Sequence, residues 1–170
     1  MNRAQDYQNT LSNLKKRNKQ FQLNKINLYL NQLLPQYDDV IYNREDNWAT
    51  PKEFLTNGYG DCEDYVIIKY YSLIKLGFKE KNLYLTGVKE RYKGGLHMVL
   101  TYFTKRGKAP LILDNLSFKI LNAQQRTDLE ILYLINESGV YTMDKKFKLT
   151  KVANYSQKFV ELQEKVQNNR

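Results

Sequence analysis

The spacing of apolar residues changes once along the chain, at about residue 80, and this change constrains the fold most strongly. Before it, apolar residues recur at helical intervals, and after it they alternate with polar residues as in half-buried strands. Helices followed by hairpin-linked strands are typical of an α+β fold with an antiparallel sheet. The chain has 170 residues, the size of one ordinary domain, so we expect a single domain over residues 1–170.

Four helices are predicted in the first half of the chain. Residues 1–20 and 21–34 have helical apolar spacing, and Pro35 ends the second of these segments. Residues 50–53, Thr-Pro-Lys-Glu, have the spacing of a capping box with proline at the first helical position, so a short helix begins there. The glycine-containing turn 57–60 ends it, and a stronger helix follows.

The only cysteine, Cys62, lies in the first turn of this stronger helix, which Asp61 opens and Gly77 terminates. Thiolate is the nucleophilic form of cysteine, and a helix N-terminus stabilises it. A lone cysteine is more often a small buried apolar residue, but the first turn after a glycine turn normally lies near the surface, which favours a reactive thiol. A single cysteine also excludes an internal disulfide framework and a multi-cysteine metal site.

Strands dominate the prediction for the second half. Hairpin turns at residues 93–95 and 106–107 connect the first three strands, and Ser138-Gly139 connects the last two. A C-terminal helix begins at a Ser156 cap. The predicted strands are 83–89, 96–104, 109–114, 131–135 and 140–143.

The only histidine, His97, begins the second predicted strand. A strand histidine is often satisfied by a local hydrogen bond, which is the alternative to a catalytic role. If residues 106–107 form a two-residue hairpin loop, Asp114 lies opposite Val99 and diagonal to His97 on the same face, within side-chain reach. A carboxylate there can fix the tautomer and orientation of the imidazole. Helix, strand and adjacent strand thus carry Cys62, His97 and Asp114 in the order of a papain/transglutaminase-like triad.

The motifs around these three residues are more specific than the residue types alone. They are NWATPKEFL at 47–55, GYGDCEDY at 58–65, Leu76-Gly77, HMVL at 97–100 and LDNL at 113–116. Together, over roughly residues 47–116, they resemble the LapG family of bacterial transglutaminase-like cysteine proteinases. The resemblance implies a papain/transglutaminase-like fold, with helices and the nucleophile at a helix start packed on an antiparallel sheet. It also implies that Cys62 is the nucleophile, His97 the general base and Asp114 its orienting partner.

The resemblance further implies a substrate, a regulator and a compartment. Proteases of this family act in the periplasm on the N-terminal region of large surface adhesins and release them from the outer membrane. A cyclic-di-GMP-sensing receptor of the inner membrane sequesters and so inhibits the protease. Residues 1–20 lack the apolar region of a secretory signal, so we expect that a leader has been removed from a periplasmic precursor.

Three acidic residues flank the cysteine. Asp61, Glu63 and Asp64 should raise the pKa of the Cys62 thiol, and a hard divalent cation such as Ca²⁺ would counter them. The alternative is that Asp61 caps the helix while the other two complement its dipole. LapG-type enzymes are calcium-dependent through acidic residues around the cysteine, so the resemblance implies Asp61, Glu63 and Asp64 as Ca²⁺ ligands. Asn82 is a weaker candidate for a further oxygen.

Acyl transfer also needs hydrogen-bond donors for an oxyanion. The backbone N–H of Cys62 is one candidate. The indole of Trp48, the only tryptophan, is another, although we favour Trp48 as a wall of the cleft because tryptophan more often supplies packing surface.

Other functions stay open on the residues alone. A transglutaminase or amidase would use the same triad, and a catalytically silent peptide-binding module would keep the fold. The net charge of +9 invites a nucleic-acid partner. The lysines are scattered, however, and no RNA-binding signature is present, so we predict no nucleic-acid partner.

Overall fold

The structure is a computed structural model that describes residues 2–33 and 47–169. Within them, four helices precede an antiparallel sheet and a fifth follows it, so the predicted α+β class is confirmed. The helices are α1 (Arg3–Leu14), α2 (Lys19–Gln32), α3 (Pro51–Asn57), α4 (Cys62–Lys75) and α5 (Gln157–Asn168). The strands, which follow a short 3₁₀ helix η1 (Glu80–Asn82), are β1 (Leu83–Glu90), β2 (Leu96–Tyr102), β3 (Leu111–Asp114), β4 (Ser117–Asn122), β5 (Leu129–Asn136), β6 (Gly139–Met143) and β7 (Leu149–Ala153).

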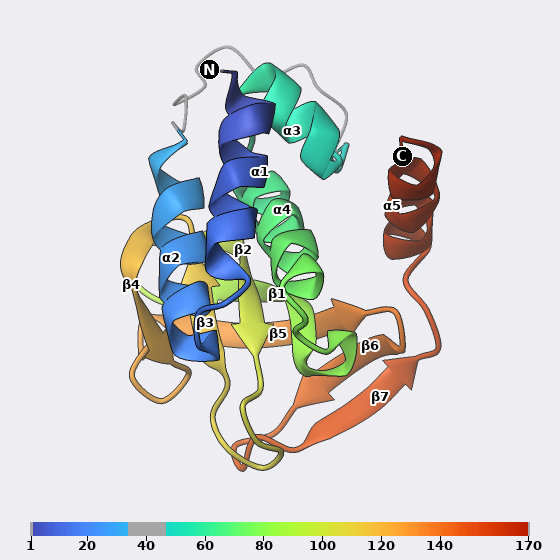
Figure 1. The fold of residues 1–170 in the computed structure, drawn as a ribbon. Helices are drawn as coiled ribbons and strands as arrows, with labels where there is room; N and C mark the ends of the chain where they lie inside the picture. The colour runs from blue at the N-terminus through green and yellow to red at the C-terminus, as the bar shows by residue number, and fades with distance from the viewer. Residues whose placement is uncertain (1, 34–46, 170) are drawn as a thin grey trace.

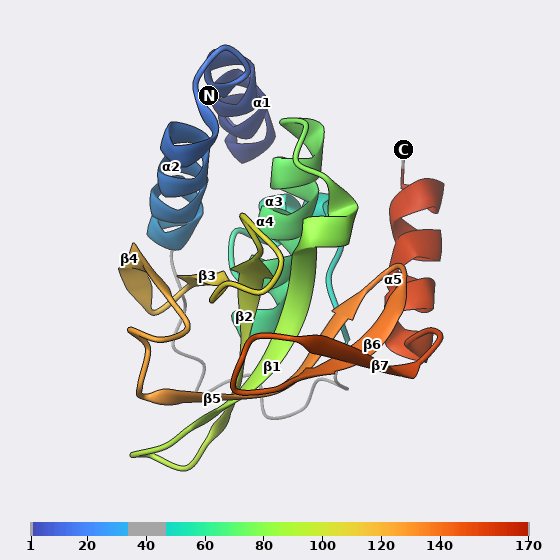
Figure 2. The same cartoon turned by 90° about the horizontal axis from the view of Figure 1, so that it is seen from below.

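The seven strands form one sheet in the order β4-β3-β2-β1-β5-β6-β7, and every neighbouring pair is antiparallel. Helix α4 packs on β1 and β2, and α2 packs on α4 and β4. Figure 1 shows α1, α2 and α4 grouped over one part of the sheet and α5 beside β6 and β7, and Phe159 of α5 packs edge-on against Tyr70 of α4. The view from below in Figure 2 shows the strands twisting under this helical layer. Helix α4, which begins at Cys62, is therefore fixed between the sheet and the N-terminal helices.

The helix starts follow their capping residues. Thr50 accepts a hydrogen bond from the Glu53 backbone and Glu53 accepts one from the Thr50 backbone, which is the capping box predicted for α3. Residues 1–20 do not form one helix, because Asn18 accepts a hydrogen bond from Phe21 N–H and begins α2 at Lys19. The predicted end of α2 at Pro35 lies outside the described residues.

The central strands are buried on both faces. The side chains that meet the helices form the main core cluster, which includes Leu85, Leu100 and Leu113. Val88, Val99 and Ile112 point to the other face, where they pack with Leu129 of β5. Because both faces are packed, a slip of one residue in strand register would move apolar side chains out of both cores.

The predicted register of β2 and β3 is confirmed. Leu100 pairs with Leu113, and Tyr102 pairs with Leu111, as a turn at residues 106–107 requires. The two strands are shorter than predicted, because Phe103 N–H donates to Asn82 O instead of continuing the ladder to β3. Since β3 ends at Asp114, the register brings the carboxylate to the level of the first residues of β2.

Two strands were missed by the sequence prediction. β4 and β7 are the edge strands of the sheet, and their exposed, polar-rich faces give little of the alternation that marks a buried strand. The predicted strands that became β5 and β6 are confirmed with slightly wider bounds, and Ser156 caps α5 as predicted. No helix in the described part of the chain is long and apolar enough to cross a membrane.

Candidate active site

The structure places Cys62 at the first position of α4, directly after the N-cap residue Asp61. The cysteine is half-buried and carries a free thiol. The backbone of Met98, the residue that follows His97 on β2, acts on the thiol and lowers its pKa. β2 pairs with β3 through residues Leu100 to Tyr102 only. The start of β2, which the sulfur faces, therefore has no β3 residue paired with it.

His97 and Asp114 meet as the hairpin register predicts. The imidazole Nε2 lies 2.7 Å from Asp114 Oδ1, and the two side chains are only 7% and 2% exposed. His97 at the start of β2 and Asp114 at the end of β3 are thus diagonal neighbours. Asn115, the other polar side chain near this point, is not the partner of His97.

The Asp114 carboxylate is ionised, and this fixes the imidazole tautomer. Burial opposes its ionisation, but hydrogen bonds from His97, the Leu116 backbone and Arg126 outweigh burial and lower the pKa of Asp114 to about 2. A carboxylate can only accept hydrogen bonds, so Nε2 of His97 carries the proton and donates it. The other ring nitrogen, Nδ1, is then the one with a lone pair for proton exchange.

The sequence prediction missed Arg126, which lies in the loop between β4 and β5. Its Nη2 donates to Asp114 Oδ2 at 3.0 Å, and its Nε and Nη2 bind both carboxylate oxygens of Asp128. Nothing in the spacing of the sequence relates residue 126 to residue 114. The only available signal was an arginine two residues before an aspartate in a loop, which is too common to be informative.

A second set of buried polar residues holds the backbone on either side of Asp114. Asn31 of α2 donates to the carbonyl oxygens of Asp114 and Ser117, at 2.8 and 2.9 Å. Asn27, one turn earlier on α2, donates to Ser117 O at 3.0 Å and accepts from Lys69 Nζ of α4 at 2.9 Å. The β3–β4 turn that carries Asp114 is therefore tied to both packed helices.

The acidic residues beside Cys62 organise the helix start. Asp61 accepts from the backbone N–H of Asp64, and Asp64 accepts from Asp61 N–H, so the pair forms a capping box. The other oxygen of Asp64 accepts from Ala49 N–H at 2.8 Å. The capping role that sequence analysis kept as the alternative for Asp61 is therefore present, and Asp64 shares it.

The same carboxylates disfavour a thiolate. Burial and then repulsion by Glu63 raise the pKa of Cys62 well above its ordinary value, although the Met98 amide opposes this. The thiol lies 3.3 Å from Glu63 Oε2, to which it donates. Burial, together with Glu63 and Asp64, also raises the pKa of Asp61 to about 8. The helix N-terminus alone therefore does not activate this cysteine.

The acidic group suits a hard cation in charge and donor type, because it consists of carboxylates that repel one another and are partly desolvated. It is not a preformed cage: among residues 2–33 and 47–169, no group of three or more His, Cys, Asp or Glu side chains converges on one metal position. Both oxygens of Asp64 already accept backbone N–H groups. A cation would therefore draw on Asp61 and Glu63 first, with further oxygens from rearranged side chains or backbone carbonyls.

Asn82 was wrongly proposed as a further ligand. Helix α4 leads the chain away from Cys62, and Asn82 lies beyond its far end in η1. There the Asn82 carbonyl accepts from Phe103 N–H, just after the end of β2 opposite to His97. Adjacency to the helix in sequence did not mean adjacency to its N-terminus.

Trp48 lies in the wall of the core. It is 7% exposed, packs in the main core cluster, and has Lys158 of α5 over its ring at 5.0 Å. Lys165 of α5 also donates to Asn47 Oδ1 and Trp48 O, at 2.7 and 3.2 Å. These contacts favour the packing role for Trp48. They also link α5 to the segment whose Ala49 N–H binds Asp64.

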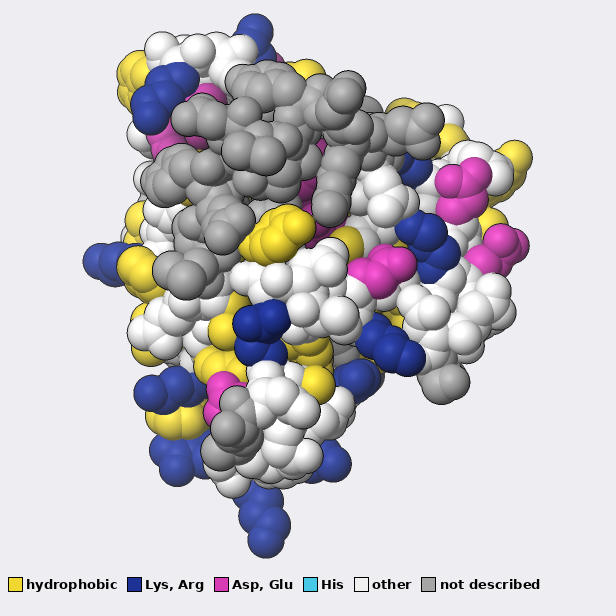
Figure 3. All heavy atoms as spheres, turned by 90° about the horizontal axis from the view of Figure 1, so that it is seen from above, with side chains coloured by type: hydrophobic (Ala, Val, Ile, Leu, Met, Phe, Trp, Pro, Cys, Tyr) yellow, Lys and Arg dark blue, Asp and Glu magenta, His cyan; other side chains and the backbone are white. Residues whose placement is uncertain are grey.

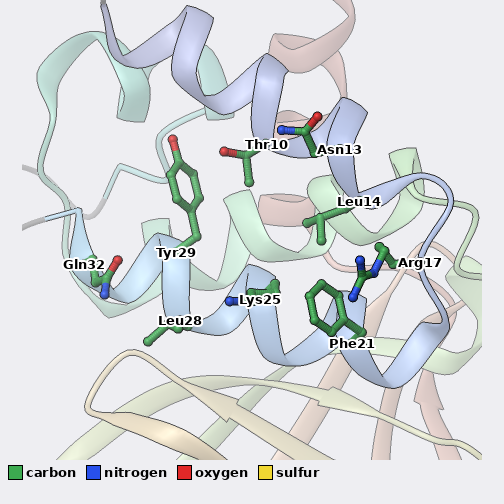
Figure 4. Close-up of a pocket in the computed structure, with 9 residues that line it drawn as sticks. All are labelled: Thr10, Asn13, Leu14, Arg17, Phe21, Lys25, Leu28, Tyr29 and Gln32. Carbon is green, nitrogen blue, oxygen red and sulfur yellow. The ribbon is translucent and has the colours of Figure 1, made fainter.

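A separate cavity of about 400 Å³ lies between α1 and α2. Figure 4 shows aromatic, polar and cationic side chains around it, including Arg17, Phe21, Lys25 and Tyr29. None of its lining residues is a candidate site residue. On the face seen from above in Figure 3, acidic and basic side chains lie interspersed among hydrophobic ones where residues are described.

The fold, with a cysteine at a helix start and a histidine bonded to an aspartate on two neighbouring strands, is that of the transglutaminase-like cysteine proteases. Residues 2–163 match the family "Bacterial transglutaminase-like cysteine proteinase", and the chain belongs to this family. The predicted family and fold class are thus confirmed. No curated protein matches the chain in sequence.

Solved structures of Legionella pneumophila LapG are similar to the chain over most of both lengths. The calcium-bound form has a TM-score of 0.85 and 33% identity, covering 94% of this chain and 87% of that one. The EGTA-treated form has a TM-score of 0.83 and 32% identity, covering 95% and 86%. A third LapG structure has a TM-score of 0.82 and 34% identity, covering 95% and 84%.

Proposed function

We propose that this cysteine protease is a calcium-dependent endopeptidase that uses Cys62, His97 and Asp114 as its catalytic triad. The observation that carries the proposal is the 2.7 Å hydrogen bond from His97 to Asp114, next to the Met98 amide that the Cys62 sulfur approaches. The proposed triad unites three residues from a helix and two strands that are far apart in sequence. The register of packed strands is strongly specified, so the pairing of His97 with Asp114 is a fixed property of the sheet.

In the proposed mechanism, Nδ1 of His97 accepts the thiol proton as Cys62 Sγ attacks the carbonyl carbon of the scissile peptide bond. The same nitrogen then gives that proton to the leaving amine, and a thioester between Cys62 and the acyl fragment remains. Water attacks the thioester while His97 accepts one of its protons. Departure of the carboxyl product, with return of the proton to sulfur, restores the enzyme. Asp114 keeps Nε2 protonated and the ring oriented throughout.

The oxyanion that forms during both attacks needs hydrogen-bond donors. The backbone N–H of Cys62, at the first position of α4, points out of the helix start and supplies one donor. Trp48 is better suited to packing than to this role, because it is buried against α5.

Calcium would be held by Asp61 and Glu63, with Asp64 as the third acidic candidate. Bound there, it would supply positive charge that offsets the carboxylates beside the thiol. Two features support this assignment: the mutual repulsion of the three carboxylates in this chain, and the calcium-bound and EGTA-treated forms of the similar LapG structures. Apart from the charge that calcium would supply, the chemistry is carried by Cys62, His97 and Asp114.

The proposed substrate is the N-terminal region of a large surface adhesin, which cleavage would release from the outer membrane. The proposed location is the periplasm, and the proposed inhibitor is an inner-membrane receptor that senses cyclic-di-GMP. Family membership and the likeness to LapG support these assignments. A protease requires a protein substrate, which agrees with the family assignment.

The experiment is incubation of the purified chain, with Ca²⁺, with the N-terminal region of an adhesin encoded beside it, followed by mass spectrometry of the products. We expect one internal cleavage, absent with the matched Cys62→Ser variant. An intact adhesin region would contradict the proposed substrate. Covalent incorporation of an added primary amine without hydrolysis would instead indicate a transglutaminase, and neither reaction would indicate a silent binding module.

A further inference from the structure

Arg126 reaches the candidate active site from outside every motif of the sequence. It belongs to the loop after β4, whose start is held by Asn122, since Asn122 Oδ1 accepts from Gln124 N–H and Gln125 N–H. The Arg126 side chain is 12% exposed, and its Nη2 lies 3.0 Å from Asp114 Oδ2. The loop is thus built to deliver one guanidinium to one buried carboxylate.

The two oxygens of Asp114 have separate partners. Oδ1 accepts from His97 Nε2 at 2.7 Å and from Leu116 N–H at 3.0 Å, whereas Oδ2 accepts from Arg126. The last torsion of an aspartate side chain is soft, so contacts on one oxygen alone hold the carboxylate plane weakly. The contact from Arg126 to Oδ2 fixes the plane from the opposite side. It therefore also fixes the direction in which Oδ1 faces His97.

Charge leads to the same assignment. Asp114 is 2% exposed, and a buried carboxylate is costly unless a cation and hydrogen bonds accompany it. Arginine keeps its charge at every working pH, so it is a permanent partner for this carboxylate. Asp128 binds the same guanidinium through Nε at 3.0 Å and Nη2 at 2.9 Å, which presets its orientation.

We propose that Arg126 is a positioning residue for the reaction, which orients Asp114 and through it His97, with Asp128 presetting the guanidinium. The link to turnover rests on the proposed function of Cys62, His97 and Asp114. The link to the His97–Asp114 geometry does not, and it can be measured in the absence of any substrate.

The experiment uses the single histidine of the chain as a spectroscopic reporter. In protein with ¹⁵N-labelled histidine, the Nε2–H proton bonded to Asp114 gives one strongly downfield signal. We expect Arg126→Gln to move this signal upfield or to broaden it by exchange with water. The matched control is Arg106→Gln. Arg106 lies in the β2–β3 loop, where its side chain donates to Lys81 O and the Tyr84 hydroxyl and not to Asp114. The control should leave the signal unchanged.

Kinetics on the adhesin region give the second readout. Loss of a charge-assisted hydrogen bond in Arg126→Gln should lower kcat by about ten- to a hundredfold with little change in KM. The loss should be absent in an Asp114→Ala background, because Arg126 acts through that carboxylate. Arg126→Lys should recover part of kcat, since it restores the charge without the two-pronged geometry.

An unchanged His97 signal and unchanged kcat in folded Arg126→Gln would overturn the proposal. If that variant does not fold, Asp128→Asn gives the same test with the arginine retained, and it should shift the signal in the same direction by less. An unshifted signal in Asp128→Asn would then overturn it. If the wild-type chain cleaves nothing, the proposed function fails, while the His97 signal still decides whether Arg126 positions the pair.

Discussion

The two sides of the candidate active site differ in how their charge is balanced. On the strand side, the Asp114 carboxylate has a histidine, an arginine and a backbone N–H around it, and its pKa falls to about 2. On the helix side, Asp61 lies beside two further carboxylates, and burial and their repulsion raise its pKa to about 8. The strand side is complete within the chain, whereas the helix side lacks a positive partner among its described contacts. Orientation of His97 is therefore built into the fold, whereas under the proposed function activation of the thiol requires calcium from outside the chain.

The largest effect should come from removing either reacting group. Cys62→Ala and His97→Ala should each lower cleavage by at least about a thousandfold while the fold stays intact, because each residue type occurs once and nothing can replace it. The double variant should lose no more than either single one, since the pair acts as a unit. Cleavage rates measured beside circular dichroism spectra check this. Wild-type-like turnover in either variant would remove the thiol-protease mechanism.

On the strand side, the hydrogen bond between His97 and Asp114 can be removed by substituting Asp114. Asp114→Ala should lower kcat by about a hundred- to a thousandfold, because the imidazole loses the group that fixes its tautomer and leaves a buried N–H without a partner. Asp114→Asn should retain more activity, since an amide oxygen can still accept from Nε2–H. Steady-state kinetics on folded variants distinguish the two. Full activity in Asp114→Ala would mean that another group holds His97.

The charge balance on the helix side can be tested by removing and restoring calcium. EGTA should lower activity by about ten- to a hundredfold and lower the melting temperature, and Ca²⁺ should restore both, because a ligand of the native state stabilises it by mass action. Mg²⁺ should substitute poorly, since it demands a tighter octahedral geometry. Isothermal titration of chelator-treated protein gives the stoichiometry. The absence of any heat of Ca²⁺ binding would count decisively against the site. The control is Asp144→Asn, which removes a carboxylate on the β6–β7 turn and should leave Ca²⁺ binding unchanged.

The smallest expected effect is a pH dependence of stability on the helix side. The pKa of Asp61 is about 8 in the folded chain and near 4 when unfolded, so the folded state binds more protons between these values. In EGTA, the melting temperature should therefore fall as the pH rises from about 4 to about 8, and Asp61→Asn should flatten the slope. With Ca²⁺ the slope should reverse, because the cation binds the ionised form. Thermal melts at matched ionic strength measure it, and identical slopes with and without Ca²⁺ would contradict the assignment.

The parts of the site that could be predicted are those encoded by local patterns. The positions of Cys62 at a helix start and of Asp114 diagonal to His97 follow from a capping motif and a hairpin register. Arg126 could not be predicted, because its contact depends on how the β4–β5 loop folds back over the end of β3. Strand β4 was missed because it is an edge strand, and its partly exposed sequence shows little alternation.

The sequence also could not show whether Asp61 and Asp64 cap the helix, bind a cation or do both. A capping box and a cation site use the same residue types at the same spacing, so pattern alone does not separate them. Only the structure shows that both carboxylate oxygens of Asp64 accept from backbone N–H groups, while the Glu63 carboxylate accepts from the thiol. Asn82 was misassigned because it follows the C-terminal end of α4. The two ends of this fourteen-residue helix lie about 20 Å apart.

The contacts of α5 have a consequence for biosynthesis. Lys165 binds the segment at Asn47 and Trp48, and the next residue, Ala49, donates to the cap of the catalytic helix. The α5 residues that brace the start of α4 are therefore synthesised after Cys62, His97 and Asp114. A nascent chain that ends before α5 has its cysteine, histidine and aspartate but not this brace, so we expect the start of α4 to reach its final stability only after α5 has been synthesised.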